Sequence, residues 1–141
     1  MKILITKRTP PDPATLRELE AEFVPLSDLL TRSDIVTIHI PNTPQTHRMI
    51  GEKELALMKK DAYIINTSRG AIIDEKALLK ALQSGRLGGA ALDVFEAEPP
   101  KEWTLVQLPN VVCTPHIGAQ TEEAMKTASV LLAEKIIGSL L

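Results

Sequence analysis

The stretch AYIINTSRGAIIDEKALLKALQSG, residues 62–85, decides the fold class that this sequence predicts. Its first four residues are apolar and include two isoleucines, which is typical of a buried strand that ends at Asn66. An amphipathic pattern follows, with Asp74 placed to cap a helix and Gly85 placed to end it. A strand, a polar loop and a helix in succession form the repeating unit of parallel α/β sheets.

The same alternation continues on both sides of this stretch. Further strands are predicted at residues 2–5, 35–40, 89–94 and 111–114, and further helices at residues 14–23, 27–31, 52–58 and 121–140. From residue 35 onward this order favours βαβ units. We therefore predict an α/β fold in which a mostly parallel sheet is flanked by helices. Ligands of such sheets bind outside the carboxyl ends of the strands.

The composition excludes several classes of protein. The 141 residues fit one domain, and the formal net charge of -2 speaks against a binder of nucleic acids. One Trp, one Tyr and two Phe provide no platform for stacking bases. Cys113 is the only cysteine, so a reducing compartment is expected. Because no stretch has the length of a signal peptide or a membrane span, we expect a cytoplasmic protein without a membrane partner.

Three side chains with complementary chemistry follow predicted strands: Arg69, Glu98 and His116. A guanidinium group can clamp a carboxylate through two parallel hydrogen bonds. A glutamate that is hydrogen-bonded to a histidine holds the imidazole and favours its protonated form, which can give a proton to a carbonyl oxygen. The set therefore fits the reduction of a 2-keto acid by a hydride that comes from a cofactor.

Each of these residues also has a purely structural interpretation. Arg69 alone is typical of a surface ion pair, Glu98 of a solvated carboxylate, and His116 of a structural histidine. Asp93, which ends an apolar strand, can close an Asx turn. Cys113 lies in an apolar run, where a small core residue is expected. The inference about chemistry therefore depends on the first three residues acting together.

Longer motifs resemble the D-isomer-specific 2-hydroxyacid dehydrogenases, a family that includes glyoxylate reductases and phosphoglycerate dehydrogenase. The resemblance runs from about residue 24 to the C-terminus, in the order and spacing of the family. The segments that carry it are Ser33–Pro41, Thr46, Leu57–Lys59, Ile65–Gly70, Gly89–Phe95, Glu98–Pro99 and Pro115–Ala119. The resemblance implies a Rossmann-like half of an NAD-binding domain.

The resemblance also implies roles for single residues. Arg69 would bind the substrate, His116 would act as general acid and base, and Glu98 would be the partner of His116. The NAD site would be lined by Ile40, Pro41, Thr67, Asp93, His116, Gly118 and Ala119. The expected cofactor is NAD or NADP, and the expected substrate is a small 2-keto or 2-hydroxy acid. We expect a homo-oligomer without a metal site.

The chain departs from the family pattern in its length, because members are roughly twice as long and have two domains. Residues 1–23 resemble the start of the substrate domain, residues 24–120 the second half of the NAD-binding domain, and residues 121–141 a C-terminal helix. None of the seven glycines is followed two residues later by another glycine, so the phosphate-binding motif G-x-G-x-x-G is absent. By resemblance, the residue that separates NAD from NADP lies outside this chain.

Two other classes of function stay open from the sequence. The missing glycine motif favours a truncated α/β module without catalysis, which would serve as an interaction domain. A flavodoxin-like binder is a weaker interpretation, because residues 6–10 make a poor phosphate-binding loop.

Overall fold

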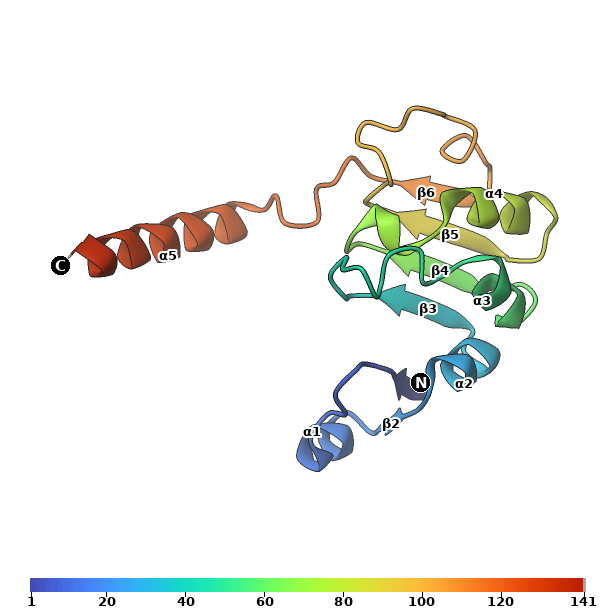
Figure 1. The fold of residues 1–141 in the computed structure, drawn as a ribbon, viewed down its shortest axis with the longest axis horizontal. Coiled ribbons are helices and arrows are strands. Elements are labelled where there is room, and N and C mark those ends of the chain that lie inside the picture. The colour runs from blue at the N-terminus through green and yellow to red at the C-terminus, as the bar shows by residue number, and fades with distance from the viewer. Residues whose placement is uncertain (141) are drawn as a thin grey trace.

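The computed structural model describes residues 1–140, with side chains up to residue 139, and confirms the predicted α/β fold (Figure 1). The described strands form a two-stranded and a four-stranded sheet, in which every pairing is parallel. The strands are β1 (Ile3–Ile5), β2 (Ala21–Phe23), β3 (Ile35–Ile38), β4 (Tyr63–Asn66), β5 (Gly89–Leu92) and β6 (Val111–Cys113). The α-helices are α1 (Pro13–Glu18), α2 (Leu26–Arg32), α3 (Glu52–Leu57), α4 (Glu75–Gln83) and α5 (Glu122–Leu140), and a 3-10 turn covers Gly70–Ile72.

The hydrophobic core lies where helices cover one face of the four-stranded sheet, whose order is β3-β4-β5-β6 (Figure 1). Ile64 of β4, Leu30 of α2 and Leu78 of α4 are completely buried, and Leu55 of α3 is nearly so. Each such side chain stabilises the fold by about 1.5–3 kcal/mol. The helix α4 begins as predicted, because the Asp74 side chain accepts hydrogen bonds from two N–H groups of its first turn.

The opposite face of the four-stranded sheet has apolar side chains that nothing in the described chain covers. Ile35, Tyr63 and Val112 are 57%, 52% and 68% exposed. Helix α5 extends away from the domain (Figure 1), and its Leu132 is 61% exposed. Exposed apolar patches of this kind mark contact surfaces. Among the described residues, no helix has both the length and the apolar character that crossing a membrane requires.

The two sheets stand side by side with no strand between them. Strand β1 pairs with β2, and β3 pairs with β4, so each keeps one unpaired edge within the described residues. Figure 1 shows β1 on the side of its sheet that faces β3. The small unit is nevertheless tied to the core, because the Val24 N–H donates to the Ile5 carbonyl at 2.9 Å and Leu4 packs against the core cluster.

The prediction of one helix over residues 14–23 is wrong in its second half. Helix α1 ends at Glu18, Glu20 adopts a φ of 49°, and the next three residues form β2. Phe23 pairs with Ile5 across the sheet, and local periodicity carries no information about such a distant partner. The strand predicted at residues 35–40 is also shorter, since it ends at Ile38 and leaves His39 in the following loop.

Candidate active site

Four loops meet at the carboxyl edge of the four-stranded sheet, where α/β proteins bind their ligands. Backbone hydrogen bonds join neighbouring loops at their roots: the Asp93 N–H donates to the Asn66 carbonyl, and the Thr114 N–H donates to the Leu92 carbonyl, both at 3.0 Å. The Ser68 hydroxyl donates to the carbonyl of Ile40, which ties the loop after β4 to the loop after β3. The parallel register of β3 to β6 therefore brings all of the predicted site residues to one edge.

Arg69 is held at this edge by the buried side chain of Asn66. The Asn66 amide nitrogen donates to the Arg69 carbonyl at 3.0 Å, and its amide oxygen accepts from the Ser68 N–H at 3.1 Å. The Arg69 side chain is exposed, and its guanidinium donates to the carbonyl of Ser68 at 2.6 Å. Within the described chain it forms no ion pair, so its charge is available to an anionic ligand.

Gly70 brings the loop of Arg69 against the loop of Glu98. A β-carbon at residue 70 would lie 1.9 Å from the carbonyl carbon of Phe95, a distance that no side chain can adopt. Gly70 is therefore required for the close approach of the two backbones. Because Arg69 precedes this contact and Glu98 follows Phe95 by three residues, the contact fixes the two functional loops relative to each other.

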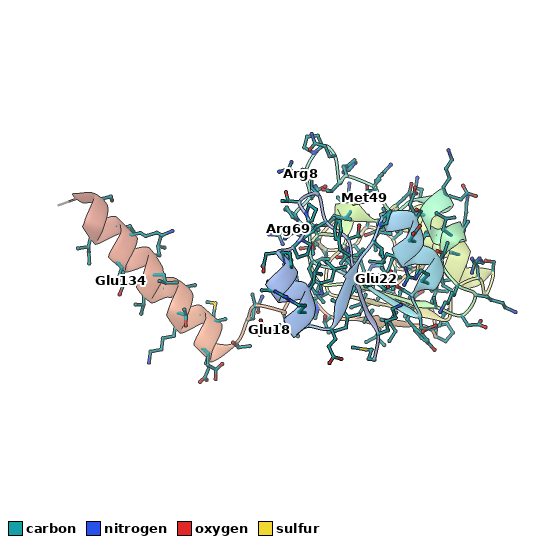
Figure 2. The ribbon with its side chains drawn as sticks, turned by 90° about the horizontal axis from the view of Figure 1, so that it is seen from below. Arg8, Glu18, Glu22, Met49, Arg69 and Glu134 are labelled. Carbon is teal, nitrogen blue, oxygen red and sulfur yellow. The ribbon has the colours of Figure 1, made fainter. Side chains whose placement is uncertain are left out.

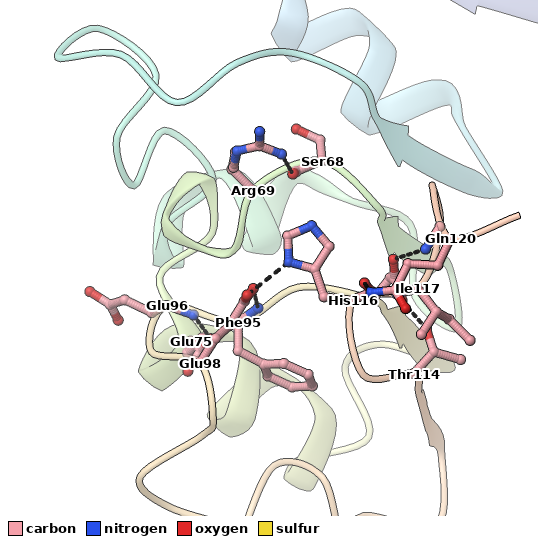
Figure 3. A network of polar contacts seen from close by, with 12 residues as sticks. Ser68, Arg69, Glu75, Phe95, Glu96, Glu98, Thr114, His116, Ile117 and Gln120 are labelled. Carbon is pink, nitrogen blue, oxygen red and sulfur yellow. Dashed lines mark hydrogen bonds and ion pairs between the residues drawn. The ribbon is translucent and has the colours of Figure 1, made fainter. Parts of the chain in front are cut away.

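His116 and Glu98 form the central polar pair of the site (Figure 3). The His116 Nδ1 lies 2.8 Å from the Glu98 Oε2, and the other carboxylate oxygen accepts the Phe95 N–H at 3.1 Å. The hydrogen bond from His116, helped by the Phe95 amide and the charge of Arg69, lowers the pKa of Glu98 below its ordinary value. Glu98 is therefore ionised at neutral pH. In Figure 3 the ring presents its free Nε2 toward the side on which Arg69 lies.

Asp93 anchors the loop that carries His116. Its buried carboxylate accepts hydrogen bonds from the Thr114 hydroxyl, from the Ile117 N–H at 2.9 Å and from the Gly118 N–H at 2.8 Å. The Thr114 hydroxyl is the main cause that lowers the pKa of Asp93, and the two amides add to it. This network holds His116 in a backbone conformation with a φ of 54°. The Gln120 side chain adds a hydrogen bond to the His116 carbonyl at 3.1 Å.

Two pockets open between these loops. A pocket of about 430 Å³ is lined by both members of the Glu98–His116 pair and, on its apolar side, by Trp103 and Val106. A second pocket of about 750 Å³ is lined by His39, Ile40, Pro41, Asn42, Thr67, Ser68 and Arg69. Of the residues predicted to line the NAD site, Asp93 and His116 face the first pocket, and Ile40, Pro41 and Thr67 face the second. Gly118 and Ala119 are exposed and line neither pocket.

Several residues of the site escaped the sequence analysis. Asn66, Ser68 and Thr114 make its supporting hydrogen bonds, and Trp103 forms part of a pocket wall. Asn66 was visible as a polar residue at the end of a buried strand, which is a signal for a local hydrogen-bonding role. Cys113 is half-buried beside the first pocket, and burial raises the pKa of its thiol. Among the described residues, no cluster of His, Cys, Asp and Glu is arranged to hold a metal ion.

This chain belongs to a family of nucleotide-binding oxidoreductase domains. The family is described as D-isomer specific 2-hydroxyacid dehydrogenase, NAD binding domain, and its pattern matches residues 1–118. The match includes residues 1–23, which the sequence analysis assigned to the start of a substrate domain.

Named relatives agree with this membership. A glyoxylate reductase of Thermococcus litoralis is 49% identical over 137 residues, which are 97% of this chain and 41% of that protein. A D-3-phosphoglycerate dehydrogenase of Methanocaldococcus jannaschii is 53% identical over 111 residues, which are 79% of this chain and 21% of that protein. The chain thus spans less than half the length of these relatives.

Solved structures give the same result. The crystal structure of a glyoxylate reductase from Paecilomyes thermophila superposes with a TM-score of 0.93 at 38% identity and covers 99% of this chain and 42% of that one. An NAD-complexed D-isomer specific 2-hydroxyacid dehydrogenase from Lactobacillus delbrueckii has a TM-score of 0.87 at 34% identity, with 98% and 46% covered.

The residues present fit one end of a dinucleotide better than the other. The second pocket lies between the loops after β3 and β4, borders Arg69 and has room for a nicotinamide ring with its ribose. The glycine motif that cradles the pyrophosphate has no counterpart in the sequence. The fit therefore concerns the nicotinamide end and the residues that would surround it.

Proposed function

We propose that this chain carries the catalytic half of an NAD(P)-dependent dehydrogenase that reduces a small 2-keto acid to a D-2-hydroxy acid. The observation that carries the proposal is the Glu98–His116 pair at 2.8 Å, which lies at the same carboxyl edge of the sheet as Arg69. The Arg69 guanidinium has no carboxylate partner within the described chain. A proton donor beside a free cation is the arrangement that a keto acid requires, because its carbonyl and its carboxylate are adjacent.

His116 would supply the proton in this reaction. Glu98 accepts the hydrogen bond of Nδ1, which leaves Nε2 to donate to the carbonyl oxygen of the substrate as negative charge develops there. Glu98 in turn is oriented by the Phe95 N–H, so the imidazole has a fixed direction before the substrate arrives. In the reverse direction the same nitrogen would accept the proton of the hydroxy acid.

Arg69 would bind the carboxylate of the substrate. Its planar guanidinium matches two carboxylate oxygens, which fixes the orientation of the neighbouring carbonyl as well as its position. Ile40, Pro41 and Thr67 would hold the nicotinamide end of the cofactor in the adjacent pocket. The bound cofactor supplies the hydride.

We also propose that the protein acts in the cytoplasm as a homo-oligomer. The single, half-buried Cys113 supports a reducing compartment. The apolar side chains Ile35, Tyr63 and Val112 on the open face of the sheet support association, because exposed apolar surface of this kind is usually covered in an assembly.

A module without catalysis is the second candidate. It is favoured by the absent glycine motif and by the unpaired edges of β1 and β3, which suit a domain that needs another polypeptide to complete it.

Oxidation of NADH or NADPH by the full chain in the presence of glyoxylate or hydroxypyruvate separates the two candidates. We expect turnover that falls by about 10²–10⁴-fold in His116→Ala, because general acid catalysis contributes that much. His47→Ala is the matched control, since His47 is exposed and lines neither pocket. Absence of turnover at high protein concentration, with the chain folded, would reject the enzymatic proposal and leave the binding module.

A further inference from the structure

The carboxylate of Glu75 makes a contact that its place in the chain does not require. Glu75 is the first residue of α4, where a carboxylate gains from the positive end of the helix without any further partner. The cap of α4 is supplied by Asp74, whose carboxylate accepts from the N–H groups of Lys76 and Ala77. Glu75 is instead half-buried, and its carboxylate accepts the backbone N–H of Glu96 in the loop after β5. The side chain therefore joins two segments that are 21 residues apart in sequence.

The amide that Glu75 holds belongs to the turn that carries Glu98. The peptide group between Phe95 and Glu96 lies so close to Gly70 that a β-carbon on the glycine would be 2.1 Å from its oxygen and 2.5 Å from its nitrogen. Gly70 thus limits one side of this peptide group, and Glu75 holds its N–H. Because a peptide group is planar, the two contacts together fix the direction in which the chain leaves Phe95 toward Glu98.

The preceding amide of the same turn orients the Glu98 carboxylate (Figure 3). The Phe95 N–H donates to the Glu98 Oε1 at 3.1 Å, while the Glu98 Oε2 lies 2.8 Å from the His116 Nδ1. A carboxylate that reaches a backbone amide and an imidazole at the same time depends on the exact course of the turn. A change at Glu75 would therefore reach His116 through the backbone of the turn and the Glu98 side chain.

We propose that Glu75 is a positioning residue of the Glu98–His116 pair, and that it holds the turn at Phe95 so that the Glu98 carboxylate is aimed at the imidazole. Glu75 lines neither pocket, so it acts through Glu98 and does not touch the substrate. The inference rests on the proposed function, because the pair matters for the reaction only if His116 transfers the proton.

The charges around Glu75 support this role. Burial raises the pKa of Glu75, as do the charges of Glu96 and Asp74, while the Glu96 N–H and the charge of Arg48 act in the opposite direction. A carboxylate that is partly withdrawn from water needs such a hydrogen bond to compensate the cost of its burial. The side chain of Glu96 pairs with Arg48 at the surface, where an ion pair contributes little. The backbone contact is therefore the stronger link.

The titration of the Glu98 carboxyl group tests the inference on the full chain without a substrate. Carbon NMR of glutamate carboxyl groups measures it, and Glu98→Gln identifies the resonance. In the unmodified chain the pKa of Glu98 should lie below its ordinary 4.5, mainly because of the hydrogen bond from His116. In Glu75→Ala this pKa should rise toward 4.5, because the turn no longer aims the carboxylate at the imidazole. The sign is decisive, since removal of a nearby negative charge would by itself lower the pKa of Glu98.

Glu75→Asp is a second disruptive variant, which keeps the charge at the start of α4. Its side chain is one methylene shorter and does not reach the Glu96 N–H, so the pKa of Glu98 should rise as in Glu75→Ala. Because an acidic residue in the first turn favours a helix, this variant should stay folded even if Glu75→Ala does not. Thermal melting checks that each variant is folded.

Three further variants separate positioning from other effects. Glu75→Gln loses the charge but keeps an amide oxygen for the Glu96 N–H, so the pKa of Glu98 should stay low. Glu96→Ala removes the ion pair with Arg48 and keeps the amide, so it should have the same result. Glu52→Ala is the matched control, because Glu52 is an exposed glutamate at the first residue of α3.

Under the proposed function, kcat for the keto acid should fall by about 100-fold in Glu75→Ala, because a small misplacement of a reacting group has that effect. KM should stay unchanged, since Arg69, at the margin of the domain in Figure 2, is held separately by Asn66. An unchanged pKa of Glu98 in folded Glu75→Ala or Glu75→Asp would overturn the inference. So would an equal rise in Glu75→Gln, Glu96→Ala or Glu52→Ala. If the pKa of Glu98 rises as expected but no chain turns over, the positioning role stands and the proposed enzymatic function is rejected.

Discussion

The carboxylate of Asp93 accepts a hydrogen bond from the backbone N–H of Gly118, with 2.8 Å between the oxygen and the nitrogen. The approach is so close that a β-carbon on Gly118 would lie 2.9 Å from the same oxygen. A buried charge at the end of β5 thus fixes the loop that follows β6, and His116 lies within that loop. The position of His116, the proposed proton donor, is therefore fixed by Asp93 through the backbone of the loop that carries it.

Asp93→Asn should destabilise the protein by about 1–3 kcal/mol, since the amide nitrogen would face at least one of the three donors and leave it buried without an acceptor. Urea unfolding followed by circular dichroism measures the change. Asp61→Asn, at an exposed turn, is the control and should change the free energy of unfolding by less than about 0.5 kcal/mol. An Asp93→Asn variant with an unchanged midpoint would contradict the role of Asp93 as an anchor.

The stability of the protein should fall on the acid side of the ordinary carboxyl range. Hydrogen bonds hold the pKa of Asp93 below its ordinary 3.8 and that of Glu98 below its ordinary 4.5. Since both values are lower in the folded than in the unfolded state, the stabilisation is complete above the unfolded values and is lost as pH falls through the folded ones. The free energy of unfolding, measured in urea from pH 6 downward, should therefore decline more steeply in the unmodified chain than in Asp93→Asn. If the free energy of unfolding fell equally with pH in the unmodified chain and in Asp93→Asn, ionisation of Asp93 would not be the cause of the decline.

Gly70→Ala should separate the two loops that Gly70 joins. The new methyl group cannot fit beside Phe95, so the backbone must move at a cost of about 1–3 kcal/mol. Gly138→Ala in α5 is the matched control, because nothing lies near that position and alanine favours a helix by about 1 kcal/mol. Thermal melting compares the two variants. If Gly70→Ala kept both its stability and its reduction of the keto acid, the contact between Gly70 and Phe95 would not be what positions the loops of Arg69 and Glu98.

Arg69→Lys should weaken substrate binding without weakening the fold. Lysine keeps the charge but loses the planar pair of donors, so we expect KM for the keto acid to rise by about tenfold or more. The free energy of unfolding should stay within about 0.5 kcal/mol, because the exposed guanidinium has one hydrogen bond within the described residues, to the carbonyl of its neighbour Ser68. Arg17→Lys on α1 provides the comparison. Steady-state kinetics measures KM, and urea unfolding measures the free energy of unfolding. An unchanged KM would show that Arg69 does not bind the substrate.

The parts of the fold with strong local signals could be predicted from the sequence. Helix α4 has a capping aspartate at its start and Gly85, with a φ of 68°, just after its end, and both signals lie within the segment itself. Strand β2 could not be predicted, because it is defined by its pairing with β1 and its residues continue the apolar spacing of α1. Distant pairing of this kind overrides local periodicity.

The same distinction holds for the candidate site. That Glu98 and His116 lie together follows from two loops at one edge of a parallel sheet, which the order of strands predicts. That Asp93 binds the backbone of the His116 loop required the tertiary structure, since the accepting carboxylate and the donating N–H groups of Ile117 and Gly118 are 24 and 25 residues apart in sequence.

The contact between Gly70 and Phe95 limits how the proposed active site can change its size. Because the two backbones touch, the loops that carry Arg69 and Glu98 are already at their closest approach. The pocket beside Glu98 and His116 is also lined by Trp103, which is 57% exposed. Under the proposed function, replacing Trp103 by a smaller residue would enlarge this pocket while the contact at Gly70 stays in place.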